Sequence, residues 1–455
     1  MKTIGFLFLV ISTAALGQTK DSTLTFKKRV LETTEVDFLL SYYKQDGKHS
    51  AVGGGVGSED LSDIASNIVV ALPLNDDDVL TIDAGVTTYT SASSSNTNPL
   101  DKSDRKPTPW QTSSGASESD QLFSLTANYS HSSNDRNKIW NADISFSNEY
   151  DYTSFGFGGG YTQLFNHKNT EISIKGNAYI DQWRPIYPKE LDLTLGSVGN
   201  SSVFGYTIYN ENGLVSNLYH PIAFEKYSSS NRNSYSLSLA FSQILTKKIQ
   251  MSVFMDILSQ QGLLATPYQR VYFADKANFY VGDPQYISVY TTTLNNGAFQ
   301  LADDNENLPK TRFKIPIGTR FNFYINQFVV AKTYYRYYFD DWGIRSHTFF
   351  IDVPIKISEK FTLNPMYRYY KQTASDYFAP YEQHLSTERY YTSDYDLSKF
   401  NSNQYGLGIS YLDIFTSAKI FILGLKSIDL RFNHYQRSDG LSSNIGTLGF
   451  KFLVD

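Results

Sequence analysis

The sequence predicts an all-β protein, a transmembrane antiparallel up-and-down β-barrel of about sixteen strands, with fourteen or eighteen strands as the alternatives. Three observations lead to this fold class. The 455-residue chain begins with an export signal, period-2 segments follow one another along the remainder, and the spacers between these segments alternate between short and long. Short turns at one rim and long loops at the other are typical of barrels that span a membrane.

Composition agrees with this class. The chain contains 35 Tyr and 31 Phe, its aromatic fraction is 15%, and its charged fraction is only 19%. Aromatic side chains suit a pleated sheet, and Tyr suits the boundary between lipid and water. A net charge of -5 gives no reason to expect a nucleic-acid partner. The chain has no Cys, so no disulfide holds the fold together.

The first residues, "MKTIGFLFLVISTAALGQ", have the pattern of a secretory signal peptide. Lys2 supplies the positive start, Ile4 to Ile11 the apolar region, and Ala15, Leu16 and Gly17 the small-x-small cleavage site. The apolar run is too short to span a bilayer as a helix. We therefore expect a signal peptide at 1–17, a periplasmic tail at 18–33, and an outer-membrane barrel with long extracellular loops at 34–455.

Alternation of apolar and polar residues marks the strands, because residues two apart on a strand share a face. Tight spacers such as "NDDD" at 75, "NDRNK" at 134 and "NQ" at 326 separate some strands, and long spacers such as 184–233 and 262–310 separate others. In chain order, the predicted strands are 34–45, 64–74, 79–90, 121–132, 139–154, 157–165, 171–183, 234–245, 249–261, 311–325, 328–340, 347–358, 361–377, 403–415, 419–435 and 444–454.

The stretch "KTYYRYYFDDW" at 332–342 illustrates the two faces. Tyr335, Tyr337 and Phe339 fall on one face and are expected to form part of a membrane girdle, whereas Lys332 and Arg336 fall on the other. Alternation alone also fits a β-sandwich, in which one face of each sheet is exposed to solvent. The export signal, the asymmetry of the rims and the end of the chain favour the barrel.

The last segment, "NIGTLGFKFLVD", carries a resemblance to a known group. Gly449, Phe452 and Val454 fit the terminal signal that barrel-assembly machinery recognises, although Asp455 replaces the usual final aromatic residue. With the hairpin rhythm, the mature chain resembles bacterial outer-membrane β-barrel proteins of the porin-like kind, and most nearly their uncharacterised families. The resemblance implies a barrel in the outer membrane and brings no established activity with it.

Some residues fit the strand pattern poorly. Pro316, Pro354 and Pro365 lie inside predicted strands, where each removes a hydrogen-bond donor, so we expect either bulges or misplaced boundaries there. The segment "AKIFILGLKSI" is apolar at both parities, which leaves its register open. The glycines of "GFGGG" at 156–160 are expected to mark a tight hairpin and a close backbone approach.

Charged residues of inward parity are the candidates for lining a pore. Their distribution predicts one basic wall and a more acidic wall opposite. Such a lumen either orients polar or anionic solutes by its field, or holds structural charge pairs in a partly water-filled interior. The candidates are Arg312, Lys314, Arg320, Lys332, Arg336, Lys356, Arg368, Arg431, Asp83, Asp143, Asp256, Asp340 and Asp352.

We expect a passive pore or uptake channel for small hydrophilic solutes rather than an enzyme. The alternatives are a closed barrel whose loops bind partner proteins, and an outer-membrane hydrolase that uses His347 or His434 near the outer strand ends. The Tyr-rich, Asn-rich loop at 204–233 is expected to be unpaired extracellular cover, and the alternatives are a surface that binds sugars or proteins and a constriction folded into the lumen. The acidic run at 303–307 offers oxygen ligands but lacks the spacing of a known calcium loop, so no metal and no cofactor are expected.

The expected partners are outer-membrane lipid, the barrel-assembly machinery and, for a pore, a small hydrophilic solute. The sequence leaves the oligomeric state open.

Overall fold

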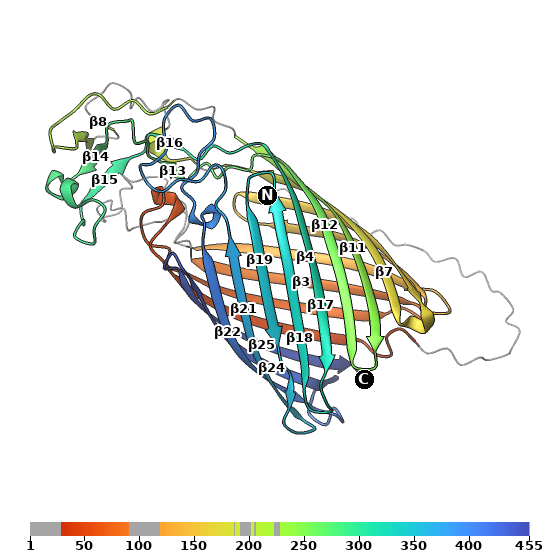
Figure 1. Ribbon diagram of the computed structural model, residues 1–455. Helices are drawn as coiled ribbons and strands as arrows, with labels where there is room; N and C mark the ends of the chain where they lie inside the picture. The colour runs from red at the N-terminus through yellow and green to blue at the C-terminus, as the bar shows by residue number, and fades with distance from the viewer. Residues whose placement is uncertain are drawn as a thin grey trace, which may run out of the picture.

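Sixteen long antiparallel strands form a closed barrel in the computed structural model, which describes residues 29–90, 119–185, 187–191, 202–203, 206–222 and 228–454. The first strand, β1 (Glu35–Asp46), pairs with the last, β25 (Ser442–Val454), and so closes the sheet. The barrel is visible in Figure 1, with a compact group of loops at one end. This closure confirms the predicted fold class and strand number. The predicted signal peptide lies outside the described residues.

The remaining wall strands follow one another around the barrel, each paired antiparallel with its neighbours. The short β20 (Ile355–Lys356) continues β19 in the same register, and β23 (Lys419–Ile420) pairs only with the start of β24. The wall strands are β2 (Leu61–Pro73), β3 (Asp78–Thr90), β4 (Ser119–Ser132), β5 (Lys138–Asn148), β6 (Tyr152–Phe165), β7 (Thr170–Trp183), β11 (Ser230–Thr246), β12 (Ile249–Gly262), β17 (Thr311–Tyr324), β18 (Val330–Asp340), β19 (Arg345–Asp352), β21 (Phe361–Gln372), β22 (Asn401–Leu412) and β24 (Leu423–Arg437).

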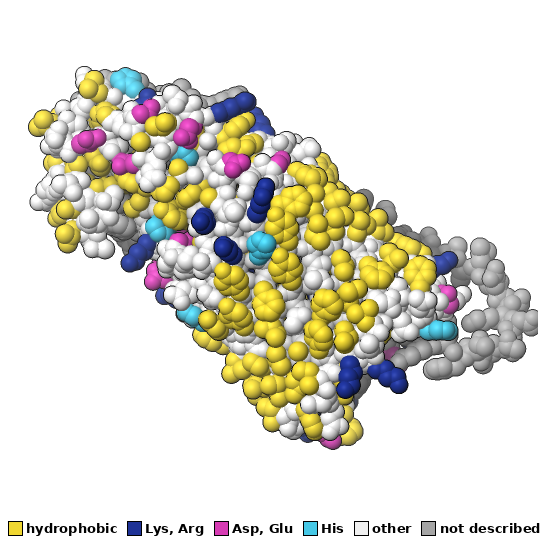
Figure 2. Space-filling model, viewed as in Figure 1, with side chains coloured by type: hydrophobic (Ala, Val, Ile, Leu, Met, Phe, Trp, Pro, Cys, Tyr) yellow, Lys and Arg dark blue, Asp and Glu magenta, His cyan; other side chains and the backbone are white. Residues whose placement is uncertain are grey.

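The outer face of the barrel is apolar. On β5 and β6, Ile144 is 61% exposed and Phe157 is 56% exposed, whereas Ser154 and Gly156, which point to the other face, are buried. Figure 2 shows hydrophobic side chains over the middle of the wall, with most charged side chains near the two ends and on the loops. An apolar band between two polar rims is the surface that a membrane-spanning barrel presents to lipid.

The loops at one rim fold into a compact structure with its own core, which we call the cap. It comprises residues 47–60, the described parts of 184–222, and residues 263–310 and 373–400. Its main sheet joins β10 (Tyr209–Asn210), β14 (Phe279–Gly282) and β15 (Ala298–Leu301), and β13 (Arg270–Val271) pairs with β16 (Asp304–Asn305). Among the described residues, no helix is both long and apolar enough to cross a membrane.

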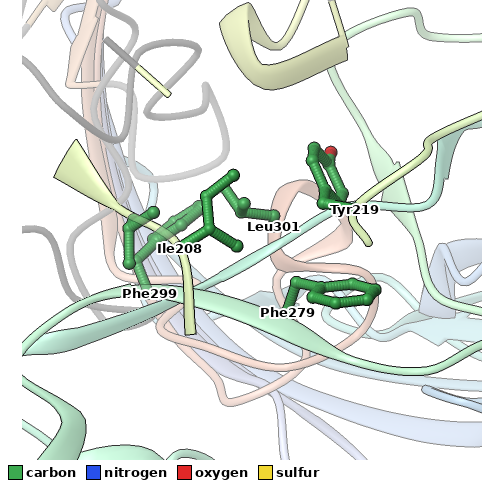
Figure 3. Close-up of a cluster of buried hydrophobic side chains, with 6 residues drawn as sticks. Ile208, Tyr219, Phe279, Phe299 and Leu301 are labelled. Atoms are coloured by element: carbon green, nitrogen blue, oxygen red, sulfur yellow. The ribbon is translucent and has the colours of Figure 1, made fainter. Parts of the chain in front are cut away.

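Side chains from separate loops meet in the core of the cap (Figure 3). Ile208 and Tyr219 come from one loop, and Phe279, Phe299 and Leu301 come from another. All five are buried, and the Tyr219 hydroxyl donates to the carbonyl oxygen of Ala302 over 2.7 Å. The expectation that residues 204–233 are unpaired cover is therefore wrong for the described part of that loop, because Tyr209 and Asn210 pair with β14.

Two other expectations about local structure need correction. The turn between β5 and β6 lies at 149–151, so the glycines of 156–160 stand inside β6 rather than in a hairpin. The expected close approach is present, because a Cβ at Gly158 would collide with the Asp143 carboxylate. The ambiguous segment at 418–428 covers β23 and the start of β24, and within β24 the pairing with β25 shifts register between Leu425 and Ser427.

The three prolines are accommodated without bulges. Pro316 leaves a local gap in the β12–β17 ladder, which resumes in the same register, and Pro365 stands inside the β21–β22 ladder opposite Leu407. Only Pro354 interrupts a strand, between β19 and β20. Each proline lacks a backbone N–H and so removes one hydrogen bond from the sheet, but it does not change which residues of its strand face inward.

Gly262, where β12 leaves the barrel, offers a test of the rim. Its φ of 113° is in the region that favours glycine, and a Cβ there would collide with the backbone of Asn231 on β11. We expect Gly262→Ala to destabilise the barrel by about 1–3 kcal/mol, measured as a lower temperature of unfolding in detergent. Gly446→Ala is the matched control, because a Cβ at Gly446 meets nothing within 4 Å. Equal melting temperatures for the two variants would contradict this account.

Candidate functional site: a basic cavity in the barrel lumen

A cavity of about 690 Å³ lies against the inner face of β17 to β22, and we call it the basic cavity. Four of its lining residues are cations, and all four were expected from inward parity. Its lining comprises Arg320, Asn322, Lys332, Thr333, Tyr334, Arg336, Thr348, Phe350, Met366, Arg368 and Gln404.

The register of the sheet brings these cations together. Arg320 of β17 stands opposite Tyr334 of β18, Tyr334 opposite Phe350 of β19, and Phe350 opposite Arg368 of β21. Neighbouring strands lie roughly 4.8 Å apart, so the backbones of Arg320 and Arg368 are separated by roughly 14 Å. Two aromatic side chains therefore lie between two guanidinium groups in one row across the wall.

The other two cations flank this row on β18. Lys332 and Arg336 lie two residues before and two residues after Tyr334, on the same face of the strand. The Nε atom of Arg336 is buried and has no hydrogen-bond partner. Together the four cations surround a patch formed by Tyr334 and Phe350.

No carboxylate stands among the described residues that line the basic cavity, and none of its four cations forms an ion pair with the described part of the chain. Across the sheet, Lys332 stands opposite Asp352, but the two do not form an ion pair. The guanidinium carbon of Arg320 lies 5.6 Å from the ring centre of Phe254 and 5.4 Å from that of Tyr334. These cation–π contacts hold the arginine in place without neutralising it.

Other inward-facing charges of the barrel are paired. Arg312 donates to Asp340 from both Nε and Nη2, over 2.9 and 2.5 Å, and Lys175 Nζ lies 3.0 Å from Asp143 Oδ1. The structural charge pairs of the second interpretation are therefore present in part of the lumen. Charge pairs occupy these positions, and unpaired cations occupy the basic cavity.

A second cavity of about 620 Å³ has mixed charge. Its lining includes Asp37, Asp429, Arg431 and Lys451. Lys451 Nζ lies 2.6 Å from Glu35 Oε2 and 3.8 Å from Asp37 Oδ2. Arg431 thus shares its cavity with acids, whereas no acid lines the basic cavity.

The remaining pore candidates lie outside these two clusters. Lys314 is half-buried on β17, and Lys356 is exposed in β20 near the short-turn rim. Asp83 of β3 stands opposite Thr126, and Asp256 of β12 opposite Ser238. These residues surround the lumen without forming a further shared site.

Of the aromatic residues of β18, Tyr335, Tyr337 and Phe339 lie on its outer face, and Tyr335 is 41% exposed. The Tyr335 hydroxyl hydrogen-bonds to His347 Nδ1 over 2.8 Å, and Tyr337 packs against the same imidazole ring. Ser346, the neighbour of His347, is buried on the opposite face of β19, so the two cannot act as a nucleophile and its base. His434 bonds to Asn444, while Asp439 bonds to Arg437.

The acidic run at 303–307 is part of the cap. Asp303 accepts from the backbone N–H of Phe273, Asp304 from the Tyr391 hydroxyl and Glu306 from the backbone N–H of Thr266. Within the described ranges, no group of three or more His, Asp or Glu is placed to hold a metal ion. These carboxylates serve the packing of the cap.

Sequence reasoning missed two parts of this site. Phe254, which positions Arg320, has inward parity on β12. An aromatic residue on the otherwise polar face of this strand is the sequence feature that could have indicated its role. Gln404 joins the cavity from β22 because Arg368 stands opposite it. That neighbour depends on the register between strands, which the sequence does not reveal.

A closed sixteen-stranded sheet with an apolar exterior and a charged lumen defines an outer-membrane β-barrel. The chain belongs to the family described as "Protein of unknown function (DUF3570)", whose model matches residues 7–450. No curated protein sequence matches the chain.

Among solved structures, the chain is similar to several outer-membrane proteins and receptors. A bacterial polysaccharide outer membrane secretin has 8% identity and a TM-score of 0.40, over 92% of this chain and 98% of that one. The outer membrane protein OpdK from Pseudomonas aeruginosa has 7% identity and a TM-score of 0.36, over 92% and 99%. The siderophore receptor PirA from Acinetobacter baumannii has 10% identity and a TM-score of 0.39, over 90% and 54%.

Proposed function

We propose that this protein resides in the bacterial outer membrane and is a passive channel for small hydrophilic solutes. One observation carries the proposal: the closed sixteen-strand barrel has an inner face with charged cavities of about 690 and 620 Å³. Barrels of sixteen strands are wide enough to leave an aqueous channel. The outward Tyr335, Tyr337 and Phe339 would then meet lipid, and Gly449, Phe452 and Val454 of β25 would carry the signal for the assembly machinery.

The charges of the lumen give the channel a preference for anions. The unpaired cations lie on β17 to β21, whereas Asp83 and Asp143 lie on β3 and β5, far from them around the barrel. Asp143 is partly neutralised by Lys175, so the basic side dominates the local potential. A low-dielectric wall around a charged lumen focuses such a field and raises the local concentration of counter-ions.

Purified folded protein is expected to give ohmic current in a planar bilayer, with a reversal potential in a KCl gradient that favours chloride over potassium. Replacing both Arg320 and Arg336 by Gln should shift that reversal potential toward potassium. Lys175→Gln together with Asp143→Asn is the matched control, because it removes a charge pair and leaves the net charge of the lumen unchanged. Absence of ohmic current from folded protein would contradict the channel.

The cap favours a second function, a scaffold whose extracellular face binds a partner protein. Loops that served only as cover would not need a buried core such as that around Ile208 and Tyr219. Folded protein that carries no current in the bilayer experiment, with the cap intact by hydrogen exchange, would favour this scaffold over the channel.

A further inference from the structure

We infer that the basic cavity binds an organic oxyanion that carries at least two negative charges and a planar ring. The inference rests on the proposed function, because a solute reaches this cavity through the lumen. It adds a ligand class and a residue set to the channel. Transport of such solutes through the channel would then saturate at high solute concentration, unlike diffusion through a pore that has no binding site.

The charge of the cavity is the first reason. Arg320, Lys332, Arg336 and Arg368 line one cavity whose described lining contains no acid. Four cations around one cavity give it a positive potential, and an anion bound between them offsets their mutual repulsion. Elsewhere in the lumen the protein supplies that anion itself, as Asp340 does for Arg312. Here no acid lines the cavity, so the complementary ligand carries more than one negative charge.

The donors of the cavity are the second reason. The buried Nε of Arg336 lacks an acceptor, and a buried donor without an acceptor is unfavourable. Guanidinium groups match the two oxygens of a carboxylate or phosphate. Arg320 is held in place by the rings of Phe254 and Tyr334, so it does not need to be ordered when the ligand arrives.

The shape and the remaining lining select the body of the ligand. A cavity of about 690 Å³ is in the range of sites that hold whole organic molecules, and it is too large for a single small ion. Tyr334, Phe350 and Met366 form the apolar surface between the cations. A flat unsaturated ring can stack on such a surface while its charged substituents reach the cations around it.

The test is equilibrium binding of benzene-1,3,5-tricarboxylate to the full-length protein in detergent, measured by titration calorimetry at low salt. We expect saturable binding to one site that weakens as salt is added. Inorganic phosphate, which lacks the ring, should bind at least tenfold more weakly, and neutral benzamide should not bind. Phosphate binding as tightly as the tricarboxylate would overturn the ring requirement.

Variants identify the site. Arg336→Gln and Arg368→Gln should each weaken binding of the tricarboxylate roughly tenfold, the usual effect of losing one charged hydrogen bond. Lys175→Gln should leave binding unchanged, because Lys175 belongs to β7 and pairs with Asp143. Asp352→Asn removes the acid opposite Lys332 and should tighten binding several-fold, a gain that misfolding cannot imitate.

Two outcomes would overturn the inference: no saturable binding to folded wild-type protein, or equal affinity for wild type and the double variant of Arg336→Gln with Arg368→Gln. Binding in detergent does not require conduction. Protein that binds the tricarboxylate but carries no current would therefore overturn the channel alone. Protein that conducts but does not bind would overturn this inference alone.

Discussion

Glu190→Ala is expected to unfold the cap while the barrel stays closed. Glu190 and Arg270 are 0% and 2% exposed, and Arg270 Nε donates to Glu190 Oε1 over 2.6 Å. Arg270 also donates from Nη1 to the carbonyl oxygen of Val52, so it joins three cap segments. Removing the carboxylate leaves a buried guanidinium without its counter-charge, which costs about 3–5 kcal/mol.

Amide hydrogen exchange across residues 263–310 measures this effect, and the temperature at which the barrel unfolds in detergent shows that the barrel is intact. Glu388→Ala is the control within the cap. Its carboxylate pairs with His384 but is 39% exposed, so its loss should cost less than about 1 kcal/mol. Exchange protection in Glu190→Ala equal to that of wild type would show that the pair does not hold the cap.

A second variant separates charge from packing. Replacing Glu190 by Leu together with Arg270 by Met removes both charges and keeps apolar volume in the cap. Apolar replacement of a buried ion pair is often neutral or stabilising. The double variant should therefore recover much of the exchange protection that Glu190→Ala loses.

The barrel was predictable because each strand carries its own evidence. On β17, Phe313, Ile317 and Phe321 face out while Arg312 and Arg320 face in, and this alternation needs no knowledge of neighbouring strands. The cap has no such local pattern. Ile208 and Leu301 are buried only because loops distant in the sequence fold against each other. Contacts of that kind depend on tertiary structure, which periodicity does not reveal.

The candidate site was predictable only in part. Parity identified Arg320 and Arg312 alike as inward-facing cations. The register between β17 and β18 then separates their roles, because it brings Asp340 within reach of Arg312 and gives Arg320 an aromatic neighbour, Tyr334. Which charges are paired therefore depends on cross-strand neighbours, and these neighbours decide which cations remain available to a solute.

The cap is also expected to loosen as the pH rises from about 4 to about 8. Burial raises the pKa of Asp303 to about 7. The charge of Lys276 lowers this pKa, whereas the charges of Glu382 and Asp304 raise it further. Burial and the charge of Asp394 raise the pKa of Glu306 to about 8. Hydrogen bonds from Thr392 and Thr266 and the charge of Arg232 lower this pKa, but by less. Both groups lie in the cap, outside the membrane-spanning strands.

The direction follows from proton linkage. In the unfolded cap these carboxyls lose their protons near pH 4, whereas in the folded cap they keep them until pH 7 or 8. Between these values the unfolded state binds fewer protons, so raising the pH favours unfolding. The stability that these two protonated carboxyls contribute to the cap is fully present below about pH 4. It is lost as the pH rises through their pKa values in the folded cap. The loss is on the order of a few kcal/mol for the two groups together.

Hydrogen exchange of residues 298–307, measured as free energies of opening at pH 5 and pH 8, should show this loss. The amides of the barrel strands serve as the internal reference. Glu306→Gln keeps an oxygen that can accept from the backbone N–H of Thr266 but cannot ionise, so it should flatten the pH dependence. Equal free energies of opening at the two pH values in wild type would mean that these carboxyls remain ionised, and that burial does not control the stability of the cap.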